Sequence, residues 1–250
     1  MAGLTARANE DRPMAGIVLI LIAYLFFSFV DSGAKWLAIA GLPALQLSFM
    51  RYLGHLLITL ILVIKSGAIV DHIVSERPLL VVVRALLLVG STVGNFFAIR
   101  YLPLTLTSTI LFSAPIIICA LSWPLLGERV GIWRWSAILF GFCGIMIAIR
   151  PFDESFNLAV ILSLASAVCF ALYSILTRKL SGTVAADTMQ LYVGLVGTIV
   201  LAPFAVAEWK DPDLASQWII LFGLGFFGWL GHQFLTRAHG YAPANLMMPF

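Results

Sequence analysis

The sequence has few charged residues and few cysteines, and it lacks long polar stretches. Only 11% of its 250 residues are Asp, Glu, Lys or Arg, whereas about a quarter is usual in a soluble domain. This shortage excludes a water-soluble globule. All three cysteines lie in apolar segments, so we expect no disulfide framework. The sequence also contains no phosphate-binding loop, His-Glu-x-x-His motif or zinc-spaced Cys/His cluster. We therefore expect neither an enzyme nor an ATP-driven pump, and no cofactor.

What the sequence does contain is a series of apolar segments of membrane length. Hydrophobic residues make up 61% of the chain, and the mean hydropathy is +1.02. A helix needs about 20 residues to cross about 30 Å of hydrocarbon. Eight segments meet this length: 14–34, 44–65, 78–100, 104–126, 132–150, 157–180, 189–207 and 216–236. A ninth begins near Pro243. The sequence therefore predicts an all-α polytopic membrane protein.

The basic residues are distributed unevenly between the two ends of these segments. With residues 1–13 as a cytoplasmic tail, most of them fall on the cytoplasmic side, as the positive-inside rule requires. We interpret them as topological anchors in a bacterial inner membrane and not as a nucleic-acid surface. The inner set is Arg7, Arg12, Lys65, Arg77, Arg84, Arg129, Arg134, Arg178, Lys179 and Arg237, and the outer set is Lys35, Arg100, Arg150 and Lys210.

The two halves of the chain resemble each other. Residues 94–100 (GNFFAIR) match 231–237 (GHQFLTR) at three of seven positions, and 27–37 align with 170–180. Five spans precede the second half, so that half must run through the membrane in the opposite direction. Inverted repeats of this kind are common in secondary transporters. We expect one five-helix repeat at 14–151 and an incomplete one at 156–250, which is about 43 residues shorter.

Several short motifs mark the spans and the turns between them. They are Phe49-Met50-Arg51-Tyr52, residues 98–103 (AIRYLP), Ala114-Pro115, residues 125–129 (LLGER), Gly141 to Gly144 with Arg150-Pro151, and residues 237–243 (RAHGYAP) with Pro249-Phe250. Together they resemble the drug/metabolite transporter superfamily, specifically its EamA-type permeases. The resemblance covers nearly the whole chain and implies ten helices in two five-helix repeats. The family's second Gly-Glu turn and tenth helix have no counterpart, so we expect a truncation within the ninth helix.

Four ionisable residues in the first two spans are candidates for function, because charges are retained in hydrocarbon where they face a cavity or a partner. Arg51 and His55 share one helix face. There Arg51 either contacts an anionic substrate group or is a structural arginine that snorkels or forms an ion pair with Asp31. Asp31 and Lys35 have i,i+4 spacing. They are either a proton-coupling pair or an interfacial ion pair.

Polar residues of later spans could complete a site between the repeats. Asn95 and His232 occupy matching positions of the two aligned segments, which favours a site at the repeat interface. Interhelical hydrogen bonding is the alternative. Tyr173 could line a polar cavity, and Trp229 is the one tryptophan placed deeply enough to stack on a substrate ring.

These features predict a secondary transporter that moves a small organic metabolite, such as an amino-acid, nucleoside-like or vitamin-like solute, by alternating access. An exporter of the same fold is the first alternative. A non-transporting scaffold, or an inactive truncated product, is the second. The expected partners are the lipid bilayer and a small-molecule substrate. Protons and a homodimer partner remain open.

Overall fold

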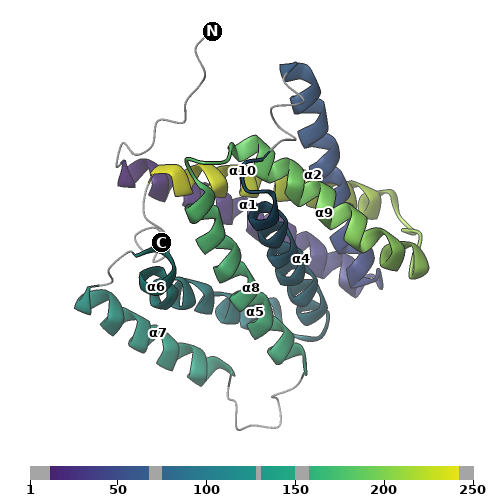
Figure 1. Cartoon of the computed structure of the whole chain (residues 1–250). Coiled ribbons are helices and arrows are strands. Elements are labelled where there is room, and N and C mark those ends of the chain that lie inside the picture. The colour runs from purple at the N-terminus through teal and green to yellow at the C-terminus, as the bar shows by residue number, and fades with distance from the viewer. Residues whose placement is uncertain (1–11, 68–74, 128–130, 150–157, 242–250) are drawn as a thin grey trace.

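The computed structural model describes residues 12–67, 75–127, 131–149 and 158–241, and every regular element in these ranges is a helix (Figure 1). In chain order the helices are α1 (Pro13–Ile39), α2 (Ala44–Ser66), α4 (Pro78–Tyr101), α5 (Leu104–Leu111), α6 (Ser113–Leu126), α7 (Ile132–Ile149), α8 (Leu158–Leu180), α9 (Ala186–Ala207) and α10 (Ala215–Tyr241). Seven membrane-length apolar spans occur in the described part, with Leu104–Leu121 counted as one. The chain is therefore an all-α polytopic membrane protein, as predicted.

The fourth expected span, 104–126, differs from the prediction because it is divided. Helix α5 ends at Leu111 and α6 begins at Ser113. Pro115 has no backbone N–H, so it cannot donate to the carbonyl of Leu111 one turn earlier. The other expected spans coincide with helices to within a few residues. Residues 1–11 of the expected tail and the expected ninth span from Pro243 lie outside the described residues.

Proline and glycine set several helix ends. Pro13 and Pro78 are the first residues of α1 and α4, a position where the missing N–H removes no intrahelical bond. Gly67 follows α2 with φ of 71°, a left-handed conformation that glycine adopts without strain. The short turns that result place consecutive helices antiparallel to one another.

Helices of the two halves pack against each other in pairs: α1 along α10, α4 along α8, and α2 along α9. The first pair is antiparallel, because the Arg12 N–H before α1 donates to the Tyr241 carbonyl at the end of α10 at 3.2 Å. The second is antiparallel too, since Val81 near the start of α4 shares a core cluster with Leu180 at the end of α8. We call the face where α1 begins and α10 ends the N-terminal face, and the face where α1 ends the opposite face.

The aligned glycines of the two halves each lie against a helix of the other half. A Cβ on Gly94 of α4 would lie 3.0 Å from the Leu162 carbonyl oxygen of α8. A Cβ on Gly231 of α10 would lie 2.4 Å from the Phe27 ring of α1. At both glycines the third helix of one half thus approaches the first helix of the other half closely, although Leu162 and Phe27 do not align with each other.

The interior of the bundle contains buried polar side chains within an apolar core, and its outside is apolar. Exposed side chains on the helix surfaces include Leu25, Ile61 and Phe222, which suit contact with lipid. Arg84 and Gln190, by contrast, are fully buried. Because lipid cannot satisfy polar groups, these side chains must find partners inside the protein. The interior is where a functional site has to be sought.

Candidate functional site: a polar cavity between the two halves

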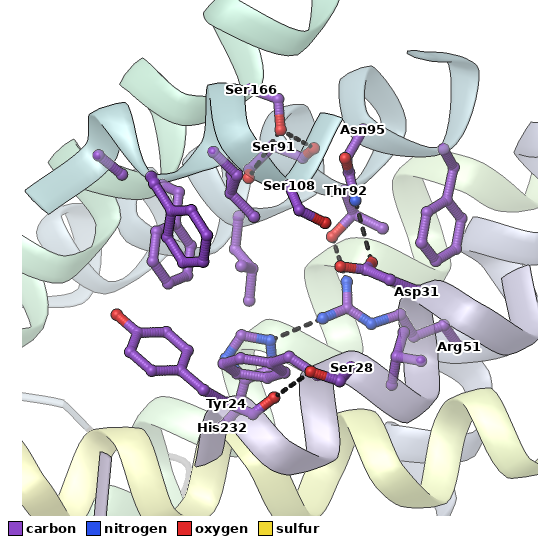
Figure 2. Close-up of a pocket in the computed structure, with 18 of the residues that line it drawn as sticks. Tyr24, Ser28, Asp31, Arg51, Ser91, Thr92, Asn95, Ser108, Ser166 and His232 are labelled. Carbon is purple, nitrogen blue, oxygen red and sulfur yellow. Dashed lines mark hydrogen bonds between the residues drawn. The ribbon is translucent and has the colours of Figure 1, made fainter. Parts of the chain in front are cut away.

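A cavity of about 510 Å³ lies between the helix pairs α1/α10 and α4/α8 (Figure 2). Helices α2, α5 and α6 complete its wall. Its polar lining residues are Tyr24, Ser28, Asp31, Arg51, Ser91, Thr92, Asn95, Ser108, Ser166 and His232, and its apolar ones are Leu21, Phe27, Val30, Leu88, Phe96, Leu111, Phe112, Ala114, Pro115 and Phe170. The volume suits a small organic molecule.

Arg51 is the cation of this cavity. Its guanidinium donates to the Thr92 hydroxyl and lies 2.8 Å from Nε2 of His232, which comes from α10 (Figure 2). The Arg51 Nε has no hydrogen-bond partner although the side chain is 93% buried (7% exposed). No carboxylate in the described part of the chain lies within 4.0 Å of its nitrogens. The guanidinium is therefore held by neutral groups only, with donor capacity left over.

Asp31 is the anion of the same cavity. It accepts a hydrogen bond of 3.0 Å from the Asn95 amide of α4 and makes no ion pair with Arg51 (Figure 2). A carboxylate has about four acceptor sites, so one amide leaves capacity for a ligand. The cavity thus presents a positive and a negative group that attract each other without forming an ion pair, and each can bind a group of opposite charge on one ligand.

A chain of hydrogen bonds leads from the cavity toward the N-terminal face. Nδ1 of His232 lies 3.1 Å from the Tyr173 hydroxyl, which in turn accepts from Arg84 at 2.8 Å. The guanidinium of Arg84 also donates to Thr177 at 2.7 Å, to Thr236 at 3.1 Å and to the Met189 carbonyl at 3.2 Å. Arg84 therefore connects α4 to α8, α9 and α10 on the N-terminal side of the cavity.

Arg84 is the residue that the sequence assigned differently. The sequence predicts a topological anchor here, but the Arg84 side chain is 0% exposed and its hydrogen-bond partners are all neutral. A signal was present: Arg84 lies as far into its span as Arg51 lies into the preceding one. A basic residue nearly two turns inside a span is too deep for a simple anchor.

The predicted site residues fall into three groups. Asp31, Arg51, Asn95 and His232 line the cavity. Tyr173 and His55 lie behind them. The ring centroid of His55 is 6.2 Å from that of His232. Lys35 and Trp229 are outside the lining. The Lys35 ammonium donates to the carbonyls of Ile99 and Leu102, and Trp229 is half-buried on α10.

Aromatic and interrupted segments form the rest of the wall. Phe27 packs edge-on to Phe170, with ring centroids 6.5 Å apart, and Phe112 stands at the break between α5 and α6. Because Pro115 leaves the Leu111 carbonyl without its helical donor, the break brings backbone polarity to the cavity. Interrupted helices beside a central cavity are typical of transporter binding sites.

An all-α membrane bundle with a polar cavity between two inverted halves defines the class of secondary transporters. The family model of the EamA-like transporters matches residues 14–150 and 157–250. The chain belongs to the EamA-like transporter family, which confirms the family predicted from the sequence. The family names a transporter rather than an enzyme or a scaffold.

Curated relatives and solved structures agree with this assignment. The chain is 29% identical to a riboflavin transporter of Vibrio cholerae, covering 96% of this chain and 81% of the relative. It is 26% identical to an S-adenosylmethionine uptake transporter of Rickettsia conorii (95% and 79%). It is 27% identical to the pseudopaline exporter CntI of Pseudomonas aeruginosa (95% and 82%). A crystal structure with 16% identity has the same fold, with a TM-score of 0.71 over 92% of this chain and 82% of that one.

Proposed function

We propose that this protein moves a small metabolite with an anionic group and a flat or aromatic part across the bacterial inner membrane by alternating access. The observation that carries the proposal is Arg51, a buried cavity cation whose hydrogen-bond partners are all neutral and which forms no ion pair with Asp31, the anion of the same cavity. A charge in hydrocarbon is retained where it has a function or a counter-charge. A carboxylate or phosphate of a substrate would supply that counter-charge.

The remaining lining suits the rest of such a substrate. Phe27, Phe96 and Phe170 offer ring surfaces for stacking. Asp31 can hold a cationic or hydrogen-bond-donating group of the same molecule. The relatives are named for riboflavin, S-adenosylmethionine and pseudopaline, and a small metabolite of this general kind is proposed here. Uptake is the proposed direction, and export is the alternative that the pseudopaline exporter represents.

The proposed orientation follows from the charges. Arg178 and Lys179 end α8 at the N-terminal face, and Lys65 ends α2 there. The opposite face has Lys35, Arg100 and Lys210. The positive-inside rule then makes the N-terminal face cytoplasmic. The two repeats, 14–151 and 156–250, would together supply the two helix pairs, α1/α10 and α4/α8, that move relative to each other around the cavity.

Proton coupling is proposed to use Asp31. The Asp31 residue is half-buried in the cavity, and its carboxylate accepts a hydrogen bond from the Asn95 amide. Protonation would cancel the only negative charge among the lining residues. Binding and release of a proton there would change the affinity for a cationic substrate group.

The test uses purified protein in liposomes and a panel of labelled solutes that are anionic, zwitterionic or neutral, each with or without an aromatic ring. We expect uptake of an anionic or zwitterionic aromatic solute. Arg51→Ala should reduce that uptake at least about tenfold, as expected when a charge-assisted hydrogen bond is lost. Arg100→Ala, at an exposed arginine at the end of α4, is the matched control. Uptake that is equal in wild type and Arg51→Ala would refute the role of Arg51.

A further inference from the structure

Two basic residues outside the cavity make the same bond in the two halves. The Lys35 ammonium of α1 donates to the carbonyls of Ile99 (2.6 Å) and Leu102 (3.0 Å) at the end of α4. The Arg178 guanidinium of α8 donates to the carbonyl of His239 (2.7 Å) at the end of α10. In each case a cation on the first helix of a half binds the last turn of that half's third helix.

The correspondence holds at the level of single residues. Aligning 27–37 with 170–180 places Lys35 opposite Arg178. Aligning 94–100 with 231–237, and continuing by two residues, places Leu102 opposite His239. Donor and acceptor are therefore equivalent in both halves. Cations at helix C-termini are favourable because the last carbonyls are unpaired and the helix dipole is negative there.

These two bonds lie at opposite ends of the bundle. The Arg12 N–H at the start of α1 bonds to Tyr241, two residues after His239, so the Arg178 bond lies at the N-terminal face. Lys35 is near the other end of α1, about 35 Å away at 1.5 Å per residue. One bond therefore stands on each side of the membrane.

Each of the two bonds also joins the same two helix pairs, α1/α10 and α4/α8. Helices α1 and α10 pack along each other, as do α4 and α8, and the cavity lies between the two pairs. The Lys35 bond joins α1 to α4, and the Arg178 bond joins α8 to α10. Both therefore connect the pair α1/α10 to the pair α4/α8, one beyond each end of the cavity.

Nearer the cavity, a second hydrogen bond joins the same helices as the Lys35 bond and another joins the same helices as the Arg178 bond. Asn95 of α4 binds Asp31 of α1, one turn before Lys35. His232 of α10 lies 3.1 Å from the Tyr173 hydroxyl of α8, and His232 is the position that aligns with Asn95. Each end of the cavity is thus spanned by two successive links between the same helices.

We propose that Lys35 and Arg178 are paired latches that position the two helix pairs, so that one must release for the cavity to open at its face. The inference rests on the proposed alternating access. Release of Lys35 opens the cavity to the opposite face, and release of Arg178 opens it to the N-terminal face. The structure has both latches closed. Neither residue touches substrate; both set which face the cavity serves.

The test measures access to the cavity and needs no substrate. Cys119, Cys143 and Cys169 are replaced by Ala, and Ser108, a half-buried lining residue of α5, is replaced by Cys as the reporter. A membrane-impermeant thiol reagent is then applied to right-side-out and inside-out membrane vesicles. Lys35→Met should speed labelling from the opposite face, and Arg178→Met should speed it from the N-terminal face. We expect each change to be about tenfold, the effect of losing a charged hydrogen bond.

Matched variants separate a latch from a general loss of packing. Lys179→Met removes the exposed neighbour of Arg178 and should leave both labelling rates unchanged. Lys35→Arg and Arg178→Lys keep the charge and should retain most of the wild-type behaviour. If Lys35→Met and Arg178→Met raise labelling equally from both faces, or change neither face, the latch proposal fails. If Arg51→Ala leaves transport intact while Lys35→Met and Arg178→Met each speed labelling from its own face, the proposed substrate role of Arg51 fails and the latch proposal is supported.

A chemical cross-link provides a check that does not depend on loss of a side chain. With Lys35 and Leu102 both replaced by Cys, a short bifunctional thiol reagent should hold the opposite face closed. Reporter labelling from that face should then fall at least about tenfold, since the open state is excluded, and it should recover when a cleavable cross-linker is reduced. Labelling that stays at its uncross-linked rate would contradict the proposal.

Discussion

The Arg84 guanidinium makes both a hydrogen bond and a cation–π contact with Tyr173. One nitrogen of Arg84 donates to the Tyr173 hydroxyl at 2.8 Å, while the guanidinium carbon lies 4.4 Å from the ring centroid. Tyr173 also reaches His232 in the cavity wall. The ring therefore connects the substrate-facing side of the cavity with the buried cation that ties four helices together.

Replacing Arg84 with Met should destabilise the protein more than it alters the cavity. The change removes four hydrogen bonds between buried groups, those from Arg84 to Tyr173, Thr177, Thr236 and the Met189 carbonyl. At about 0.6 kcal/mol for each interhelical hydrogen bond, we expect the free energy of unfolding to fall by roughly 2 to 3 kcal/mol. Thermal unfolding in detergent measures this. Arg100→Met is the control, and an equal effect of both variants would contradict the buried role.

Tyr173→Phe should remove the hydrogen-bonded link from Arg84 through Tyr173 to His232, the neighbour of Arg51, while the phenyl ring still fills the same volume. The ring and its contact with Arg84 remain, but His232 and Arg84 lose their common partner. We expect a loss of about 1 kcal/mol in stability, the usual value for one interhelical hydrogen bond. The transport rate should fall more than substrate affinity, because Tyr173 does not line the cavity. Separate measurement of substrate binding and initial uptake would decide; weaker binding with unchanged turnover would refute this.

Asp31→Asn tests the proposed proton coupling. Asparagine keeps a side-chain oxygen for Asn95 but cannot carry a charge at any working pH. Uptake driven by a pH gradient across a liposome should be lost, whereas exchange of labelled for unlabelled substrate should continue. Full gradient-driven uptake by this variant would exclude Asp31 as the coupling group.

The glycine contact between α2 and α10 should not tolerate a methyl group. A Cβ on Gly54 would lie 2.9 Å from the Cα of Gly225, so Gly54→Ala must push two backbones apart. We expect a loss of about 1 to 3 kcal/mol in stability, as for overpacking. Gly144→Ala in α7, where nothing lies within 4 Å of the added carbon, should be neutral or stabilising, since alanine favours helix. Thermal unfolding of the two variants provides the comparison, and equal midpoints would contradict it.

The spans could be read from the sequence because hydrocarbon thickness imposes a length on every helix. The break at Phe112 could not, although Pro115 was visible in the family motif. A proline inside a membrane span can kink, break or leave a helix continuous, depending on what its neighbours supply to the freed carbonyl. That depends on tertiary packing, which local sequence does not encode.

The candidate site was partly predictable for a similar reason. The sequence identified Arg51, Asn95 and His232 because a polar group deep in a span is costly unless it faces a partner or a cavity. All three line the cavity. Lys35 was paired with Asp31 through their i,i+4 spacing, yet its ammonium binds Ile99 and Leu102. Helical spacing gives only contacts within one helix, whereas unpaired carbonyls at the end of another helix were the stronger attraction.

The link between Arg51 and His232 also constrains how the protein can be made. Arg51 enters the membrane with α2, while one of its partners, His232, follows 181 residues later on α10. At a synthesis rate of about 5 to 20 residues per second, the new chain must wait roughly 10 to 40 s for that partner. Thr92 on α4 arrives after only 41 residues. The early helices are thus expected to shelter the cation through most of biogenesis, and the contact with His232 forms only when α10 inserts.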